Sequence, residues 1–217
     1  MSELVTTIWG ISLLIALVGC IPYGIWMVYT AVKKRWKRLG LMVTIPVGVF
    51  ALLLGVSAII NAGEFERHLE GLVDAEVVLG QPLFEYDSKR AFNGDGYSIS
   101  VYELPSSVRT RFEAADERLL SDFPKHPHYR DHWRFERWRR APFDGRFKKY
   151  LDFALSSYHS DHVRGLADEF RSIREVLSGT GAYYAFFYYS HGDYLGDIDL
   201  FVVDLEGNRF YLINHNT

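Results

Sequence analysis

Cysteine is nearly absent from this sequence: of its 217 residues one, Cys20, is a cysteine, and it lies inside a long apolar run. No disulfide can therefore stabilise residues 62–217, whatever compartment they occupy. These residues must fold around a hydrophobic core. They are numerous enough, because a domain of about 150 residues buries about two thirds of the surface that its unfolded chain exposes.

Charged side chains are also scarce in the first part of the chain. Up to Asn61 there is one acid, Glu3, and there are five bases, whereas residues 62–217 hold 26 Asp and Glu against 19 Lys and Arg, a net charge of −7. Duplexes are held mainly through their phosphates, so this balance argues against general nucleic-acid binding. A basic protein partner suits it better.

Two runs without any charged residue, 4–32 and 39–60, make up most of residues 1–61. A helix needs about 20 residues to cross about 30 Å of hydrocarbon. Pro22 and Pro46 are tolerable in such helices because a neighbouring helix can satisfy the carbonyls that each proline frees. Only residues 33–38 link the runs. The sequence therefore predicts a two-helix transmembrane hairpin, and the absence of acid, base or histidine inside either run argues against a transporter.

Positive charge in the link predicts the orientation of this hairpin. By the positive-inside rule the link is cytoplasmic, so both ends of the chain and the domain 62–217 lie outside the cytoplasm, at a bacterial inner membrane. A specific site for anionic lipid is the alternative reading of the link. The bases concerned are Lys33, Lys34, Arg35, Lys37 and Arg38.

The sequence Leu17-Val18-Gly19-Cys20 offers a competing interpretation, because it looks like the lipobox at which bacterial lipoproteins are cut and acylated. A secretory signal begins with basic residues and has an apolar core of about 7 to 15 residues. Here the start carries Glu3 and no base, and the apolar run continues well past Cys20. A lipoprotein would have the soluble domain in the cytoplasm.

Residues 62–217 carry both strand and helix patterns. Strand alternation and turn residues predict strands at 77–87, 97–101, 183–190, 197–204 and 209–214, with turns at 93–96 and 205–208. Apolar spacing predicts that the second span continues as a polar helix to Leu72, a helix from Pro105 to Phe123, and another from Asp161 to Gly179. We expect an α+β domain, an antiparallel sheet with helices packed on one face.

The chain has no P-loop, no GxGxxG and no nucleophile elbow. Ser190, His191 and Asp193 are the residue types of a catalytic triad, yet close neighbours along a chain point in different directions and cannot relay a proton. We therefore expect no enzyme activity and no cofactor.

Two groups of histidines, and the sequence NGDG at 93–96, carry residue types that bind metal ions. The histidines could share an ion only if the groups met, which nothing in the sequence requires. A calcium loop with Gly96 sixth would place Ala91 first and Tyr102 twelfth, so its acids are missing and a hairpin turn is favoured. We expect no metal. The histidines are His126, His128, His132, His159 and His162.

A segment of alternating aromatic residues and arginines begins at Trp133. It is interpreted first as a structural helix with snorkelling arginines, and second as a protein-binding surface; a membrane surface or stacked bases fit less well. The candidate binding residues are Trp133, Arg134, Arg137, Trp138 and Arg140, together with Asp95 in the NGDG turn.

Residues 87–104 resemble a family of small membrane-tethered bacterial proteins, of no assigned activity, that carry Asp-Ser-His-Gly-Gly-Phe-x-Gly-Asp-Gly after their membrane segment. Lys89, Arg90 and Ala91 stand where the family often has His-Gly-Gly. The aromatic strands at the end of the chain are similar in style. The resemblance implies an extracytoplasmic α+β domain and nothing catalytic. The matching residues are Asp87, Ser88, Phe92, Gly94, Asp95 and Gly96.

Two functions follow as hypotheses. The first is a non-enzymatic, membrane-tethered module that binds a protein outside the cytoplasm, as an immunity protein captures a periplasmic toxin. The alternative is a sensory or envelope-complex subunit that acts through its hairpin while the outer domain binds a small ligand.

Overall fold

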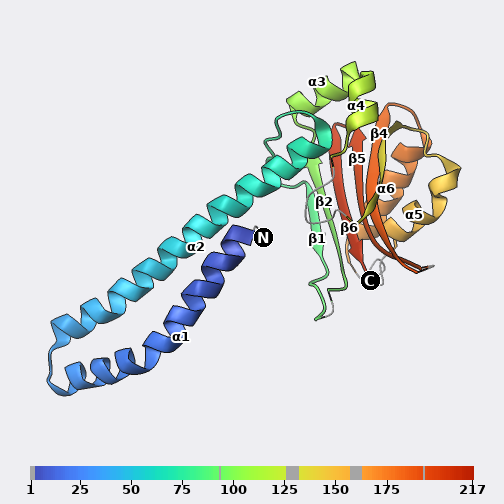
Figure 1. Cartoon of the computed structure of the whole chain (residues 1–217). Helices are drawn as coiled ribbons and strands as arrows, with labels where there is room; N and C mark the ends of the chain where they lie inside the picture. Colours follow the sequence, from blue (N-terminus) through green and yellow to red (C-terminus); the bar gives the residue numbers. More distant parts are fainter. Residues whose placement is uncertain (1–2, 93, 126–131, 157–162, 193) are drawn as a thin grey trace. The chain divides into compact units, whose positions relative to one another are not determined.

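The computed structural model of the chain describes residues 3–92, 94–125, 132–156, 163–192 and 194–217 (Figure 1). The chain divides into two compact units, Met1–Glu66 and Arg67–Thr217.

The first unit consists of α1 (Glu3–Val32) and the greater part of α2 (Trp36–Val73). The chain reverses in a short turn at 33–35, where Lys34 has φ +51° and the Arg35 N–H donates to the Thr30 carbonyl at 3.1 Å. The Tyr23 hydroxyl donates to the Met42 carbonyl, so α1 lies back along α2 (Figure 1). Lys37 and Arg38 belong to the first turn of α2.

Within the described residues, one helix is long and apolar enough to cross a membrane, α2. Its large apolar side chains, including Leu41, Val47, Leu52 and Ile59, are exposed. A contiguous apolar surface of this kind on a helix marks contact with a membrane or a partner.

The second unit is an α+β domain built on one six-stranded sheet. Its strand order is β1-β2-β6-β5-β4-β3, and every neighbouring pair is antiparallel, which confirms the predicted antiparallel sheet. The strands are β1 (Phe84–Asp87), β2 (Gly96–Glu103), β3 (Arg134–Arg140), β4 (Ala182–His191), β5 (Tyr194–Asp204) and β6 (Arg209–Asn216). The helices are the end of α2, α3 (Ser106–Ala114), α4 (Glu117–Asp122), the 3-10 turn η2 (Gly145–Phe147), α5 (Lys148–Ala154) and α6 (Leu166–Ser178).

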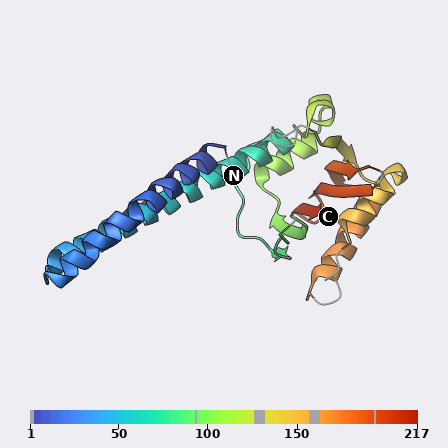
Figure 2. The ribbon, with the colours of Figure 1, turned by 60° about the horizontal axis from the view of Figure 1, so that its bottom comes forward.

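Helices cover both faces of the sheet, so the prediction of helices on one face is wrong. The end of α2, α3 and α4 pack on one face, and α5 and α6 on the other. Figure 2 shows the strands between α3 on one side and α6 on the other. The physical reason lies in β4: Phe186 and Phe187 are consecutive, point to opposite faces and are both fully buried, so each face needs cover.

The helix predicted from Pro105 to Phe123 is two helices. The chain breaks between α3 and α4, where the Asp116 carboxylate accepts a hydrogen bond from the Leu119 N–H at 2.9 Å and caps α4. The turn predicted at 205–208 is confirmed, because the Gly207 N–H donates to Asp204 at 2.8 Å and Asn208 has φ +56°. Asp161, the predicted cap of the last helix, lies outside the described residues; α6 begins after Gly165.

Candidate binding surface

The segment rich in arginine and aromatic residues is the edge strand β3, so its interpretation as a helix is wrong. β3 pairs with β4, with Phe135 opposite Phe187, and the register shifts between Glu136 and Arg139. Such a bulge adds one residue to the strand. It explains why Trp133, Phe135 and Trp138, at spacings of two and three, all reach the same face of the sheet.

Both tryptophans of this segment are core residues. Trp138 is 2% exposed and Trp133 9%. The Trp138 ring packs edge-on against Phe112 of α3, with centroids 4.7 Å apart, and its Nε1–H donates to the Leu72 carbonyl at 2.6 Å. The last carbonyls of a helix have no partner within the helix, so this indole caps the end of α2. Neither ring offers a partner an exposed aromatic face.

The arginines of β3 point outward. Arg134, Arg137 and Arg140 are exposed, while Arg139 donates to Glu136 at 3.0 Å. Two of them lie over rings: the Arg137 guanidinium is 5.5 Å from the Phe135 centroid, and Arg140 is 5.8 Å from that of Tyr183. Such contacts hold a guanidinium in place and leave its donors free to bind an anion.

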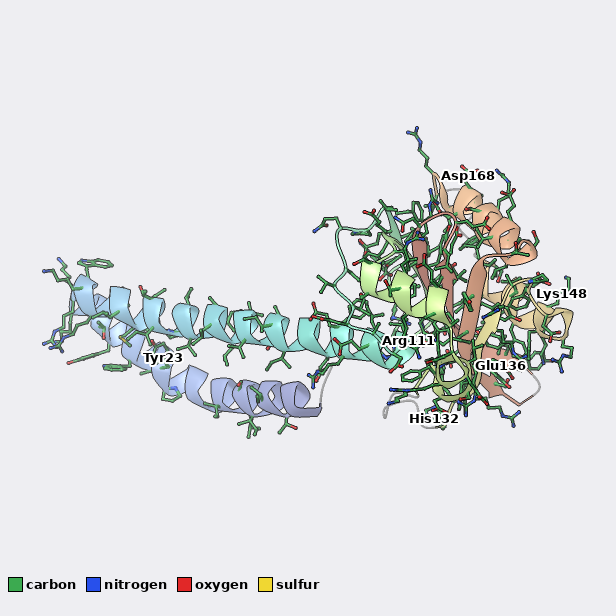
Figure 3. The ribbon with its side chains drawn as sticks, turned by 90° about the horizontal axis from the view of Figure 1, so that it is seen from above. Tyr23, Arg111, His132, Glu136, Lys148 and Asp168 are labelled. Atoms are coloured by element: carbon green, nitrogen blue, oxygen red, sulfur yellow. The ribbon has the colours of Figure 1, made fainter. Side chains whose placement is uncertain are left out.

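This positive surface continues from β3 into η2 and α5. Arg146 donates to Asp144 at 2.6 Å, and that hydrogen bond is the main reason the pKa of Asp144 is lowered to about 2. Lys148 and Lys149 follow at the start of α5. In Figure 3, Glu136 lies on the side of the domain away from Asp168 of α6, and Lys148 lies at a level between them.

The charge of the domain is therefore uneven. Residues 125–152 hold nine Lys and Arg against four Asp and Glu, a net charge of +5, while the rest of 62–217 holds ten against 22, a net charge of −12. A basic partner, expected from the total charge alone, does not fit the β3 edge. An acidic partner does, because opposite charges across an interface steer association and set its register.

A groove of about 370 Å³ adjoins the end of β3. Its apolar lining comes from Pro142, Phe143, Leu151 and Leu177, with Lys148 and Arg174 beside them. The Phe143 N–H donates to the Leu177 carbonyl at 2.7 Å, which fixes the segment after β3 against the end of α6. The volume falls at the low end of the range for ligand pockets, about 300–1,000 Å³.

A second depression, of about 550 Å³, lies at the end of α2 and is lined mostly by charged residues, among them Asp74. The Asp74 carboxylate accepts from Arg111 Nη2 at 3.0 Å and from Arg118 Nη2 at 2.9 Å. Arg111 also donates to Asp116 at 2.8 Å, and this bond, the largest cause, lowers the pKa of Asp116. These charges pair with one another and fasten the end of α2 to α3 and α4. Figure 3 shows Arg111 beside the end of α2.

Asp95 does not join the β3 surface. It lies in the loop between β1 and β2, at the opposite edge of the sheet, where its carbonyl accepts from the Ala91 N–H at 2.7 Å. The loop is longer than a tight turn, since β1 ends at Asp87 and β2 begins at Gly96, and Gly94 within it has φ +95°. Asn93 lies outside the described residues.

Among the described residues, no three His, Cys, Asp or Glu side chains are grouped so as to hold a metal ion. His132 packs edge-on against Tyr189, with centroids 5.0 Å apart. His191 lies 3.7 Å from an Asp197 oxygen on β5. The remaining histidines of the two groups, and Asp193, lie outside the described residues. The absence of enzyme activity stays a prediction.

Sequence reasoning misses a polar row across the sheet. Ser98, Asn214 and Asp199 are direct neighbours in register on β2, β6 and β5. Asn214 donates to the Asp199 carboxylate and accepts from Arg90, and Asp199 is only 6% exposed. Strand alternation around Asp199 gives no sign of this burial. An acid and an amide at matching positions of two neighbouring strands were the signal that could have found this pair.

No protein-family model, no curated protein and no solved structure matches this chain. The resemblance at residues 87–104 therefore rests on the matching residues alone.

Proposed function

We propose that this protein is a membrane-tethered, non-enzymatic module that binds a protein through the edge strand β3, in the manner of an immunity protein that captures a toxin. The observation that supports it most is the concentration of exposed arginines, Arg134, Arg137 and Arg140, on one edge of an otherwise acidic domain. Arginines beside aromatic rings are typical anchors of protein interfaces.

The proposed location is a bacterial inner membrane, crossed twice, with the basic link inside and the domain outside. The apolar exposed side chains of α2 and the bases at the turn between α1 and α2 support it. A reporter active only outside the cytoplasm, fused after Thr217, and a cytoplasmic reporter inserted near Lys37 should both give signal. A terminal reporter that works only in the cytoplasm would contradict the orientation.

Binding is tested by photo-crosslinking in cells that make the full chain. A photoreactive residue at position 137 should yield one discrete crosslinked protein, and Arg134→Glu with Arg140→Glu should abolish that product. The matched controls are a photoreactive residue at position 168 of α6 and the charge change Arg171→Glu, because Asp168 and Arg171 are exposed on α6, away from β3. Equal products from positions 137 and 168, or a product that survives both β3 changes, would refute binding through β3.

The alternative, a sensory or envelope-complex subunit, has one observation in its favour. α2 is a single helix from Trp36 to Val73, and its last turns carry Leu69 and Leu72 of the domain core. A continuous helix can transmit a displacement. Replacing residues 1–60 by an unrelated two-helix anchor should preserve the crosslink of a binding module and abolish the activity of a subunit that works through its helices.

A further inference from the structure

The groove beside β3 is an apolar site with charged walls. Pro142 and Phe143 follow the strand directly, and Leu151 and Leu177 complete the apolar lining from α5 and α6. The exposed strand residue Arg140 is only two residues before Pro142. The groove therefore begins close to the end of the β3 edge.

Two cations stand at the groove and share one carboxylate. Lys148 Nζ donates to Asp152 at 2.7 Å, and Arg174 Nη1 donates to the other oxygen of Asp152 at 3.0 Å. All three side chains are at least 43% exposed. One carboxylate cannot neutralise two cations, so the walls keep a positive charge, and an incoming acid can pair with either.

We propose that the groove receives an apolar side chain of an extended acidic segment in the partner protein, while carboxylates of that segment pair with Lys148, Arg174 and the β3 arginines. The inference rests on the proposed function and specifies the partner. The segment should be acidic because both the strand and the groove walls are positive. It should carry an apolar side chain because burying that side chain in the apolar groove removes it from water.

Gly145 supplies a clean way to block the groove. A Cβ placed on this lining residue meets no atom within 4 Å, and its backbone is not in the left-handed region. Gly145→Leu therefore adds an apolar side chain to the groove lining, and its Cβ meets no clash. Gly80→Leu is the matched control, because Gly80 is also open and lies far along the chain in the segment before β1.

The experiment is selection of ten-residue random peptides, displayed on phage, against the full chain in detergent micelles. Enriched peptides should carry several Asp or Glu and one large apolar residue. Replacing that residue by Ala should weaken binding roughly tenfold to a hundredfold, as expected for burying one such side chain. Gly145→Leu should weaken binding of the selected peptides by the same factor as that replacement, and should not change binding of their Ala variants. Gly80→Leu should change the binding of neither set.

The outcomes separate this inference from the proposed function. Acidic peptides that bind through the β3 arginines but are indifferent to Gly145→Leu overturn the groove and leave binding through β3 intact. Enrichment of basic or uncharged peptides, or no enrichment, overturns both. Loss of binding with Lys148→Glu, compared with Arg171→Glu as the matched charge change on α6, supports the positive walls.

Discussion

A substitution at Trp138 tests whether this side chain belongs to the core or to a binding surface. The sequence makes Trp138 one of the candidate binding residues, whereas the structure places its ring against Phe112 and its Nε1–H on the Leu72 carbonyl. We expect Trp138→Ala to lower the free energy of unfolding of the domain by about 3–5 kcal/mol, the usual cost of removing a large buried aromatic side chain. For a domain of this size, each kcal/mol corresponds to about 2–4 °C in Tm, so Tm should fall by about 6–20 °C.

Trp138→Phe isolates the hydrogen bond. Phenylalanine keeps most of the packing but leaves the Leu72 carbonyl at the end of α2 without its indole donor. A buried acceptor that loses its partner costs about 1–3 kcal/mol, so Tm should fall by about 2–12 °C, less than for alanine.

The assay is thermal unfolding of the full chain in detergent micelles, followed by near-ultraviolet circular dichroism. Arg137→Ala, an exposed neighbour on the same strand, is the control and should leave Tm unchanged, as surface substitutions usually do. If Trp138→Ala unfolded at the same temperature as the unaltered chain, the indole would not be part of the core and the assignment of this strand would fail.

Three further predictions concern the rest of the domain. The Tyr97 hydroxyl is buried and has no hydrogen-bond partner in the described part of the chain, so Tyr97→Phe should raise the free energy of unfolding by about 1 kcal/mol, measured by urea unfolding; a loss would reveal a missed partner. Burial lowers the pKa of His215, so the unfolded chain binds the proton more tightly than the folded chain. Stability should therefore fall as the pH drops below about 6.5. Tm measured at several pH values should show a smaller fall for His215→Phe. Asp74→Asn should lower Tm, because it removes the charge that faces Arg111 and Arg118. Asparagine tolerates the φ of +54° at this position, so the backbone is not strained. An unchanged Tm would show that these ion pairs contribute nothing to stability.

The features that the sequence predicts well depend on local patterns. The turn from Leu205 to Asn208 and the strands on either side of it follow from turn residues and alternation, and the structure reproduces them. The apolar helices also follow from composition. Their insertion in a membrane is a proposal, because an apolar composition is compatible with a membrane but does not locate a helix in one.

The features that the sequence misses depend on long-range pairing. Nothing near Trp138 indicates that β4 will pair with it or that a bulge will turn its ring toward α3. The two-sided cover of the sheet is a similar case, although consecutive aromatic residues in β4 were a readable sign of it. The buried Asp199 carboxylate accepts a hydrogen bond from Asn214 on another strand. An alternation pattern considers each strand alone and cannot indicate such a pair.

The continuity of α2 has a practical consequence for anyone who wants the domain without the apolar hairpin. A chain cut after Ile60 keeps Leu69 and Leu72, which belong to the core, and the carbonyl that the Trp138 indole needs. A chain cut after Val73, where the regular helix ends, removes all three and also leaves Arg111 beside an Asp74 that has become the chain end. The apolar hairpin and the domain therefore share one helix, and the place of the cut decides whether the sheet keeps the cover on one of its faces.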